Sequence, residues 1–160
     1  MTIKVGDKVP QATFKYLSPE GPKEITSDEL FGGKKVAFFA VPGAFTPTCS
    51  QRHLPGYLDK AAAFKAKGVD TIACVSVNDA FVMGAWGKEQ QAGDKVMMLG
   101  DGAAEFTNAM GLSMDLTKNG MGVRSQRYAM VVDNGVIKHL FVEKPGAFEV
   151  SAAENVLKSL

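Results

Sequence analysis

The stretch VAFFAVPGAFTPTC, residues 36–49, joins an apolar run to the start of a helix. Residues 36–41 are uninterrupted apolar side chains, many of them β-branched or aromatic, which is typical of a strand buried on both faces of a sheet. A similar run covers residues 70–77, and the residues between, 47–67, read as a helix that ends at Gly68. Strand, helix and strand in this order form a βαβ unit, so the two strands are predicted to be parallel.

The chain around this unit continues the alternation of helices and strands. Residues 79–91 and 103–110 read as helices, and residues 96–99 as a third short strand. Residues 1–34 are predicted to be an irregular lead-in. Residues 111–126 are polar and interrupted by glycines, so we expect a loop there.

The C-terminal part of the sequence predicts a hairpin followed by a helix. Residues 128–133 and 136–142 flank Asn134-Gly135, a strong hairpin signal because both turn residues must accept positive φ. Ser151 and Glu154 have the spacing of a capping box ahead of a helix. The sum is an α/β chain with a thioredoxin-like fold, in which a central mixed sheet carries helices on both faces.

Length and composition limit the classes of function. The chain has 160 residues, which is the size of one domain, and we expect that domain to span 1–160. Eighteen Lys and Arg against 17 Asp and Glu give a net charge of +1, which argues against a nucleic-acid or membrane-surface binder. Two cysteines are too few for a disulfide scaffold, and no apolar run approaches the ~20 residues of a membrane span.

The first residues of the sequence indicate the cellular compartment of the protein. It has neither the apolar core of a secretion signal nor the Arg/Ser-rich character of a transit peptide. We therefore expect a reducing, cytoplasmic compartment. An organelle remains an option if a transit peptide has been removed.

The residues that carry chemistry are expected at positions 46–49. Thr46 is a natural helix N-cap and Pro47 a natural first helical residue, so Cys49 falls in the first turn. There the free backbone N–H groups and the helix dipole favour an anion, which for cysteine is the thiolate. The alternative is a small apolar side chain in the core, and the position in a first turn favours a reactive thiol instead.

A reactive thiol needs more than ionisation. A free thiol with a pKa near 8.5 is about 3 % thiolate at pH 7, so complete ionisation raises the fraction of reactive thiolate only about 30-fold. Donors must also stabilise the charge that moves onto the leaving group. The Thr46 hydroxyl is one candidate donor, and an arginine guanidinium is another.

The pattern Pro42-x-x-x-Thr46-x-x-Cys49 resembles the signature of the peroxiredoxins. The string PGAFTPTC at 42–49, followed by His53-Leu54-Pro55-Gly56, is similar to the type II, or peroxiredoxin-five-like, subgroup. The resemblance runs from Val5 to Ser151. It implies a thioredoxin-like fold and a peroxidase that uses no metal and no organic cofactor.

The resemblance also implies catalytic roles. Cys49 would attack the peroxide O–O bond and become a sulfenic acid. Thr46 would bond the peroxide oxygens and the sulfur, and Arg127 would polarise the peroxide and stabilise the thiolate. Pro42 would form a wall of the pocket and limit the access of water to the sulfenate. Arg124 is the rival arginine, and either could be a solvated loop charge. Arg127 is preferred because it directly precedes the strand predicted at 128–133, as in the family.

Two residues are expected to bind substrate, Gly43 within the signature and Leu116 in the loop before Arg127. Leu116 and Met114 would line an apolar mouth that admits alkyl hydroperoxides. Phe81, Met83 and Trp86 either pack in the core of a helix or take part in a homodimer interface. No metal-ligand spacing is present.

Cys74 lies in the middle of a predicted strand, where it either packs in the core or acts as a resolving thiol for the Cys49 sulfenate. A disulfide needs Cα atoms within about 7 Å, which a mid-strand and a first-turn thiol miss without local unfolding. We therefore favour turnover on one cysteine with an external thiol. The family's usual donors are glutathione with glutaredoxin, or thioredoxin.

The sequence thus predicts a thiol-dependent peroxidase that reduces hydrogen peroxide and alkyl hydroperoxides through Cys49. The main alternative is a peroxide-sensing relay, in which oxidised Cys49 changes the binding of a partner protein. A chaperone that uses an apolar surface is a further rival, and its activity would survive Cys49→Ser.

Overall fold

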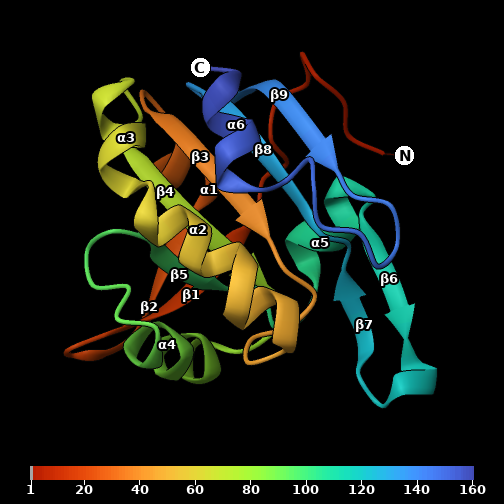
Figure 1. Cartoon of the computed structure of the whole chain (residues 1–160). Coiled ribbons are helices and arrows are strands. Elements are labelled where there is room, and N and C mark those ends of the chain that lie inside the picture. Colours follow the sequence, from red (N-terminus) through yellow and green to blue (C-terminus); the bar gives the residue numbers. More distant parts are fainter. Residues whose placement is uncertain (1) are drawn as a thin grey trace.

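The computed structural model describes residues 2–160 and contains a seven-stranded mixed sheet (Figure 1). The strand order is β2-β1-β5-β4-β3-β8-β9. The strands β3, β4 and β5 are parallel, and their neighbours in the sheet are antiparallel. The strands are β1 Thr13–Ser18, β2 Gly21–Thr26, β3 Lys35–Ala40, β4 Thr71–Ser76, β5 Met97–Gly100, β8 Tyr128–Asp133 and β9 Val136–Val142.

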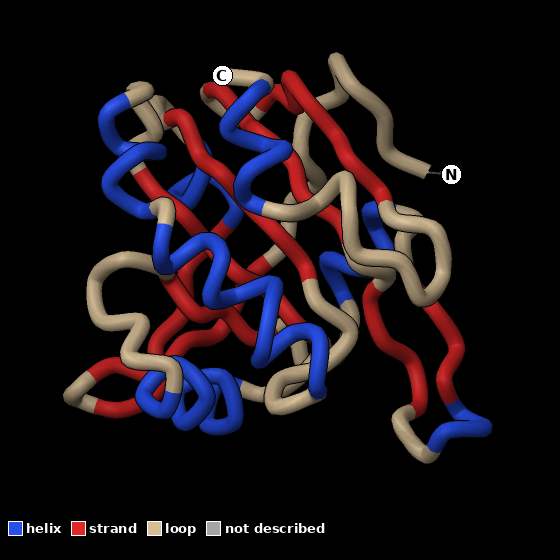
Figure 2. The backbone as a smooth tube through the Cα atoms, viewed as in Figure 1, coloured by secondary structure: helices blue, strands red, loops and turns tan. Residues whose placement is uncertain are grey.

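Helices cover both faces of the sheet, as Figures 1 and 2 show. One face packs on α1 (Ser27–Phe31) and α5 (Glu105–Met110), and the other on α2 (Leu54–Asp59), α3 (Ala61–Ala66), α4 (Ala80–Glu89) and α6 (Ala153–Lys158). Successive side chains of a strand point to opposite faces, so Phe38 and Phe39 of β3 enter different cores. The predicted layers are therefore confirmed.

The central βαβ unit has the predicted form. Residues 36–40 of β3 have no exposed surface, as expected for an apolar run buried on both faces. β3 pairs with β4 in parallel from Val36–Thr71 to Ala40–Val75. The Asn134-Gly135 hairpin is also observed, with φ values of 48° and 79°.

The prediction of an irregular lead-in over residues 1–34 is wrong, because β1, β2 and α1 lie there. β1 and β2 form an antiparallel hairpin at one edge of the sheet, where Lys15 and Glu24 pair across the strands. No residue of β2 is fully buried, three being exposed and three half-buried, so the apolar alternation that marks a strand is missing. Thr26 and Glu29 form a capping box at the start of α1, a signal that the sequence contains.

The prediction of a loop over residues 111–126 is also wrong. β6 (Ser113–Leu116) and β7 (Gly122–Ser125) form a separate two-stranded sheet, joined through the short 3₁₀ helix η2 (Thr117–Asn119). Figure 1 shows this hairpin extending away from the main sheet, and we call residues 113–125 the arm. Its strands have four residues each, and all of their residues are exposed or half-buried except Ser125, which is buried, so little hydrophobic pattern is left.

The C-terminal helix forms, but the predicted capping box does not. α6 follows Ala152, and no side chain caps it. Ser151 instead donates its backbone N–H and its hydroxyl to the Glu143 carboxylate, at 2.9 and 2.7 Å. Among residues 2–160, no helix is both long and apolar enough to cross a membrane.

Candidate active site

Cys49 begins an unusual helical turn at the carboxyl end of β3. Helical structure starts at Pro47, as predicted, and Cys49–His53 form a π-helical turn, η1, that runs directly into α2. The Leu54 N–H reaches the carbonyl of Cys49, one residue further than in an α-helix. Such π turns are rare and occur often at functional sites. The helix predicted over 47–67 is thus divided into η1, α2 and α3.

The loop before Cys49 has a defined shape, but Thr46 does not cap the helix with its side chain, contrary to prediction. Its hydroxyl donates to the carbonyl of Gly43 at 2.7 Å. The Ala44 N–H donates to the Asn78 side chain at 3.0 Å. Phe45 has a φ of 64°, which is uncommon for a residue with a side chain.

Arg127 contacts the sulfur of Cys49. It lies directly before β8, and its Nη2 donates to Cys49 Sγ at 3.1 Å. Its Nη1 donates to Nδ1 of His53 at 2.9 Å. Cys49 itself has no exposed surface. The guanidinium therefore presents fixed, positively charged donors to a buried thiol, an arrangement that stabilises negative charge on sulfur.

His53 orients this arginine. Its Nε2 lies 3.1 Å from the carbonyl oxygen of Ser151. Arginine only donates and a carbonyl only accepts, so His53 must be neutral and carry its proton on Nε2. Burial, together with the charge of Arg127, lowers the pKa of His53 to about 3. The sequence interpretation gave His53 no role. Its position four residues after Cys49 was the available signal.

This histidine predicts a loss of stability in acid. The pKa of His53 is about 6.5 when unperturbed and about 3 in the fold, so below pH 6.5 only the unfolded chain gains the proton. The free energy of unfolding should then fall by up to about 1.4 kcal/mol per pH unit as the pH drops towards 3. Urea denaturation at pH 7, 6 and 5 measures this slope. His53→Gln should flatten it and His139→Gln should not; equal slopes in wild type and His53→Gln would contradict the assignment.

Arg124 lies at the same loop but not at the sulfur. Its Nε donates to the carbonyl of Met121 at 2.9 Å and its Nη1 to the carbonyl of Pro42 at 3.3 Å. It is half-buried, so it is not a solvated loop charge. Gly43 packs closely here, because a Cβ at this position would lie 3.0 Å from Arg124 Nη1 and 3.1 Å from Cγ2 of Thr46.

A cavity of about 670 Å³ opens beside these groups. Three of the four predicted catalytic residues, Pro42, Thr46 and Arg127, line it, whereas Cys49 is buried and is not among the lining residues. The arm contributes apolar side chains to the lining, and these include Leu116 and Met114, as expected. Gly43, predicted to bind substrate, is buried and is not among the residues that line the cavity. The remaining lining residues are Pro47, Thr48, Met121, Gln126, Glu143, Lys144, Pro145, Gly146 and Ala147.

Cys74 is a buried free thiol on β4, paired with Phe39 of β3 and Met98 of β5. It shares an apolar core with Cys49. Burial raises the pKa of the Cys74 thiol well above its usual range, and negative charge on Cys49 raises it further. Cys74 is therefore a poor source of thiolate while the fold stays closed.

The helix α4, which follows β4, has both buried and exposed apolar side chains. Met83 and Trp86 of α4 are fully buried, whereas Phe81 is 62 % exposed. The Trp86 indole N–H donates to the Ser50 hydroxyl at 3.0 Å, and the side-chain amide of Gln90 donates to the Ser50 carbonyl. These contacts fasten α4 to the turn that carries Cys49.

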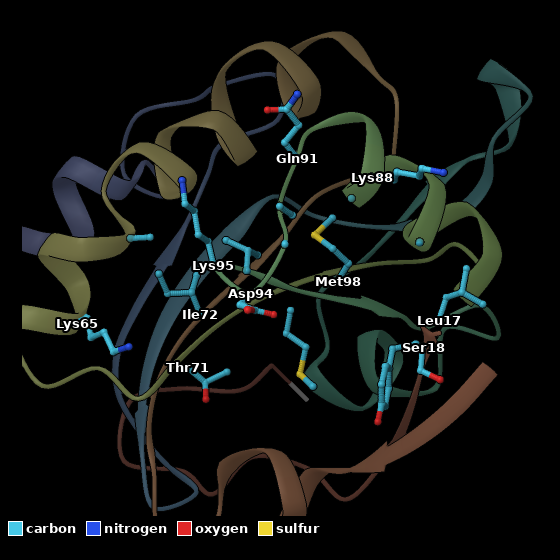
Figure 3. Close-up of a pocket in the computed structure, with 18 of the residues that line it drawn as sticks. Leu17, Ser18, Lys65, Thr71, Ile72, Lys88, Gln91, Asp94, Lys95 and Met98 are labelled. Carbon is cyan, nitrogen blue, oxygen red and sulfur yellow. The ribbon is translucent and has the colours of Figure 1, made fainter. Parts of the chain in front are cut away.

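A larger hollow of about 1060 Å³ lies between β1, α3, α4 and β5 (Figure 3). Ile72, Met98 and Leu17 contribute apolar surface to it, with Lys65 and Lys88 at its sides. No cysteine, histidine or arginine lines it. The smaller cavity is instead lined by Arg127, which contacts the Cys49 sulfur, so the smaller cavity is the candidate active site.

Comparisons with known proteins agree with this geometry. The family model described as Redoxin matches residues 4–157. Peroxiredoxin-2E, chloroplastic, of Arabidopsis thaliana is 53 % identical over 163 residues, covering 99 % of this chain and 70 % of the relative. Peroxiredoxin-2B of the same plant is 46 % identical over 159 residues, covering 99 % and 98 %.

Among solved structures, reduced Prx3 of Vibrio vulnificus in complex with hydrogen peroxide is 57 % identical and superposes with a TM-score of 0.95, covering 99 % of both chains. The shared architecture is the thioredoxin-like fold that the sequence predicts. The chain therefore belongs to the redoxin family and, within it, to the type II, peroxiredoxin-five-like peroxiredoxins, which are thiol-dependent peroxidases.

Proposed function

We propose that the chain reduces hydrogen peroxide and alkyl hydroperoxides with Cys49 as the peroxidatic residue. The thiolate attacks the terminal oxygen of R–O–O–H, so an S–O bond forms and the O–O bond breaks. The sulfur loses two electrons and becomes a sulfenic acid, and the RO⁻ fragment leaves as alcohol or water after taking a proton. The observation that carries the proposal is the 3.1 Å contact of Arg127 with Cys49 Sγ at the wall of a cavity.

The other residues of the site have complementary roles in this step. The Arg127 guanidinium stabilises the thiolate and the charge that develops on the leaving oxygen. The Thr46 hydroxyl gives its hydrogen to Gly43, so its lone pairs are available to accept the O–H of a bound hydroperoxide. Pro42 forms part of the cavity wall and limits the access of water to the sulfur.

The apolar wall supports a substrate class that includes bulky organic hydroperoxides. The cavity is far larger than hydrogen peroxide requires, and Leu116 and Met114 face it. Leu116→Ala should lower kcat/KM for cumene hydroperoxide roughly tenfold, because contacts with the organic group are lost, and leave hydrogen peroxide nearly unchanged. Steady-state kinetics with both peroxides measure this. Equal losses for the two would remove Leu116 from substrate binding.

We propose that an outside thiol completes the cycle. It attacks the Cys49 sulfenic acid, releases water and forms a mixed disulfide, which a second thiol reduces to the free Cys49 thiol. Burial and the raised pKa of Cys74 favour this route over an internal disulfide. Glutathione with glutaredoxin, or thioredoxin, has the required chemistry.

We propose further that residues 1–160 form a single domain, and that the protein acts as a homodimer without a metal or organic cofactor. The exposed side chains of Phe45 and Phe81, 50 % and 62 % accessible, support an apolar contact near the site. We place the protein in the cytoplasm, or in an organelle if a transit peptide has been removed. The chloroplast names of two plant relatives support the second option.

A coupled assay tests the function against the sensing alternative. Wild-type protein is mixed with hydroperoxide and either glutathione and glutaredoxin or thioredoxin and its reductase, and NADPH loss is followed. A peroxidase consumes many equivalents of hydroperoxide per chain with at least one donor system. Consumption that stops after one equivalent with both systems would favour a redox relay.

A further inference from the structure

The arm, residues 113–125, forms the apolar wall of the cavity but is weakly built. Its strands β6 and β7 pair with each other and with no strand of the main sheet. A two-stranded ribbon in water is at best marginally stable alone. Met114, Leu116 and Met121 nevertheless face the cavity from this ribbon. The shape of the cavity therefore depends on how the arm is fastened to the rest of the chain.

Arg124 of β7 makes that connection. Its Nε donates to the carbonyl of Met121 within the arm, and its Nη1 donates to the carbonyl of Pro42. The two bonds join two residues that both line the cavity, Met121 in the arm and Pro42, which lies 82 residues before Arg124. Within residues 2–160, this is the only hydrogen bond between the arm and the loop 42–46. A planar guanidinium suits this task because its donors have fixed directions.

The backbone of the loop is shaped for this contact. A Cβ at Gly43 would lie 3.0 Å from Arg124 Nη1 and 3.3 Å from the terminal methyl of Met121. The absence of a side chain at Gly43 thus lets the guanidinium and Met121 approach. The carbonyl of Gly43 in turn accepts the Thr46 hydroxyl. The bridge therefore links the arm to the loop that leads into Cys49.

We propose that Arg124 is a positioning residue that determines substrate specificity, by holding the apolar wall of the arm at a fixed distance from Pro42. The proposal rests on the peroxidase function proposed above. A bulky hydroperoxide needs this wall to hold its organic group. Hydrogen peroxide has no organic group, so it gains nothing from the wall.

The kinetic test compares cumene hydroperoxide with hydrogen peroxide. Arg124→Met should lower kcat/KM for cumene hydroperoxide roughly tenfold, mainly through a higher KM, and change hydrogen peroxide less than about twofold. Arg124→Lys keeps the charge but lacks the planar fork, so it should show most of the same loss. The control is Arg52→Met, which removes an exposed arginine that lies over Phe148. It should leave the ratio of the two efficiencies unchanged.

A second readout does not depend on activity. Hydrogen exchange of the amides in residues 113–125 should be faster in Arg124→Met than in wild type, with little change in β3 and β4. Two results would each overturn the proposal. One is that Arg124→Met leaves the ratio of kcat/KM for the two peroxides unchanged, and the other is that it leaves hydrogen exchange in the arm unchanged. If wild-type protein consumed neither peroxide, the proposed function would fail, and the exchange experiment would still decide whether Arg124 holds the arm.

Discussion

Replacing Cys49 with serine is expected to lower peroxide turnover by at least about a thousandfold, because the nucleophile that attacks the O–O bond is lost. A serine hydroxyl stays protonated near neutral pH and has no comparable reactivity. The side chains are similar in size and Cys49 has no exposed surface, so the fold should persist. Circular dichroism and urea denaturation verify the fold, and the coupled assay with both donor systems measures the turnover.

The matched control is Cys74→Ser. Cys74 is buried on β4, and its thiol is held protonated by burial, so its loss should leave the first oxidation of the protein at the wild-type rate. The variant should also keep its steady-state turnover if an outside thiol completes the cycle. Peroxidase activity that survives Cys49→Ser, or disappears in Cys74→Ser while the fold is intact, would contradict the assignment of the two thiols.

Arg127→Gln should lower the second-order rate constant for hydroperoxide roughly a hundredfold to a thousandfold. The variant loses the charged donor that lies 3.1 Å from Cys49 Sγ, and losses of this size follow the removal of one such donor. It also leaves Nδ1 of buried His53 without its donor, at 2.9 Å in the wild type. We therefore expect a moderate loss of stability, about 1–3 kcal/mol, in addition to the kinetic effect.

One further variant separates the charge of Arg127 from its geometry, and a second serves as a control. Arg127→Lys keeps the positive charge but cannot donate to Cys49 and His53 at the same time in a fixed plane, so it should recover only part of the rate. Arg52→Gln removes an exposed arginine over Phe148 and should stay close to wild type. Stopped-flow oxidation of each reduced variant gives the rate constants. A wild-type rate in Arg127→Gln would exclude the guanidinium from the reaction.

The parts of the fold that could be predicted are those with a strong periodic signal. β3 is a continuous apolar run, and Asn134-Gly135 can form its tight turn because both residues accept positive φ. β2 and the strands of the arm gave no such signal, because most of their side chains are exposed or half-buried. Their pairing depends on backbone hydrogen bonds, which are available to every sequence.

The candidate site also has features that the sequence predicts and contacts that it does not predict. The start of the helix at Pro47 and the place of Cys49 in its first turn follow from local preferences, and both are observed. The contacts of His53 with Arg127 and of Arg124 with Pro42 join residues 74 and 82 positions apart. The acceptor at Pro42 is a backbone carbonyl, and since every residue has one, the residue type does not predict this contact. Thr46 and Ser151 do not cap their helices with their side chains, because the Thr46 hydroxyl donates to the carbonyl of Gly43 and the Ser151 hydroxyl to the carboxylate of Glu143.

The most direct test of the central claim is the reaction of reduced wild-type protein with one equivalent of hydroperoxide at pH 7, followed by stopped flow, a thiol count and intact mass. We expect one thiol to be lost far faster than in free cysteine, with a mass gain of one oxygen on Cys49. Thiol loss no faster than that of free cysteine would contradict the claim that Cys49 is a peroxidatic residue. Rapid loss of both thiols with no oxygen retained would instead make Cys74 the resolving partner and contradict the one-cysteine cycle.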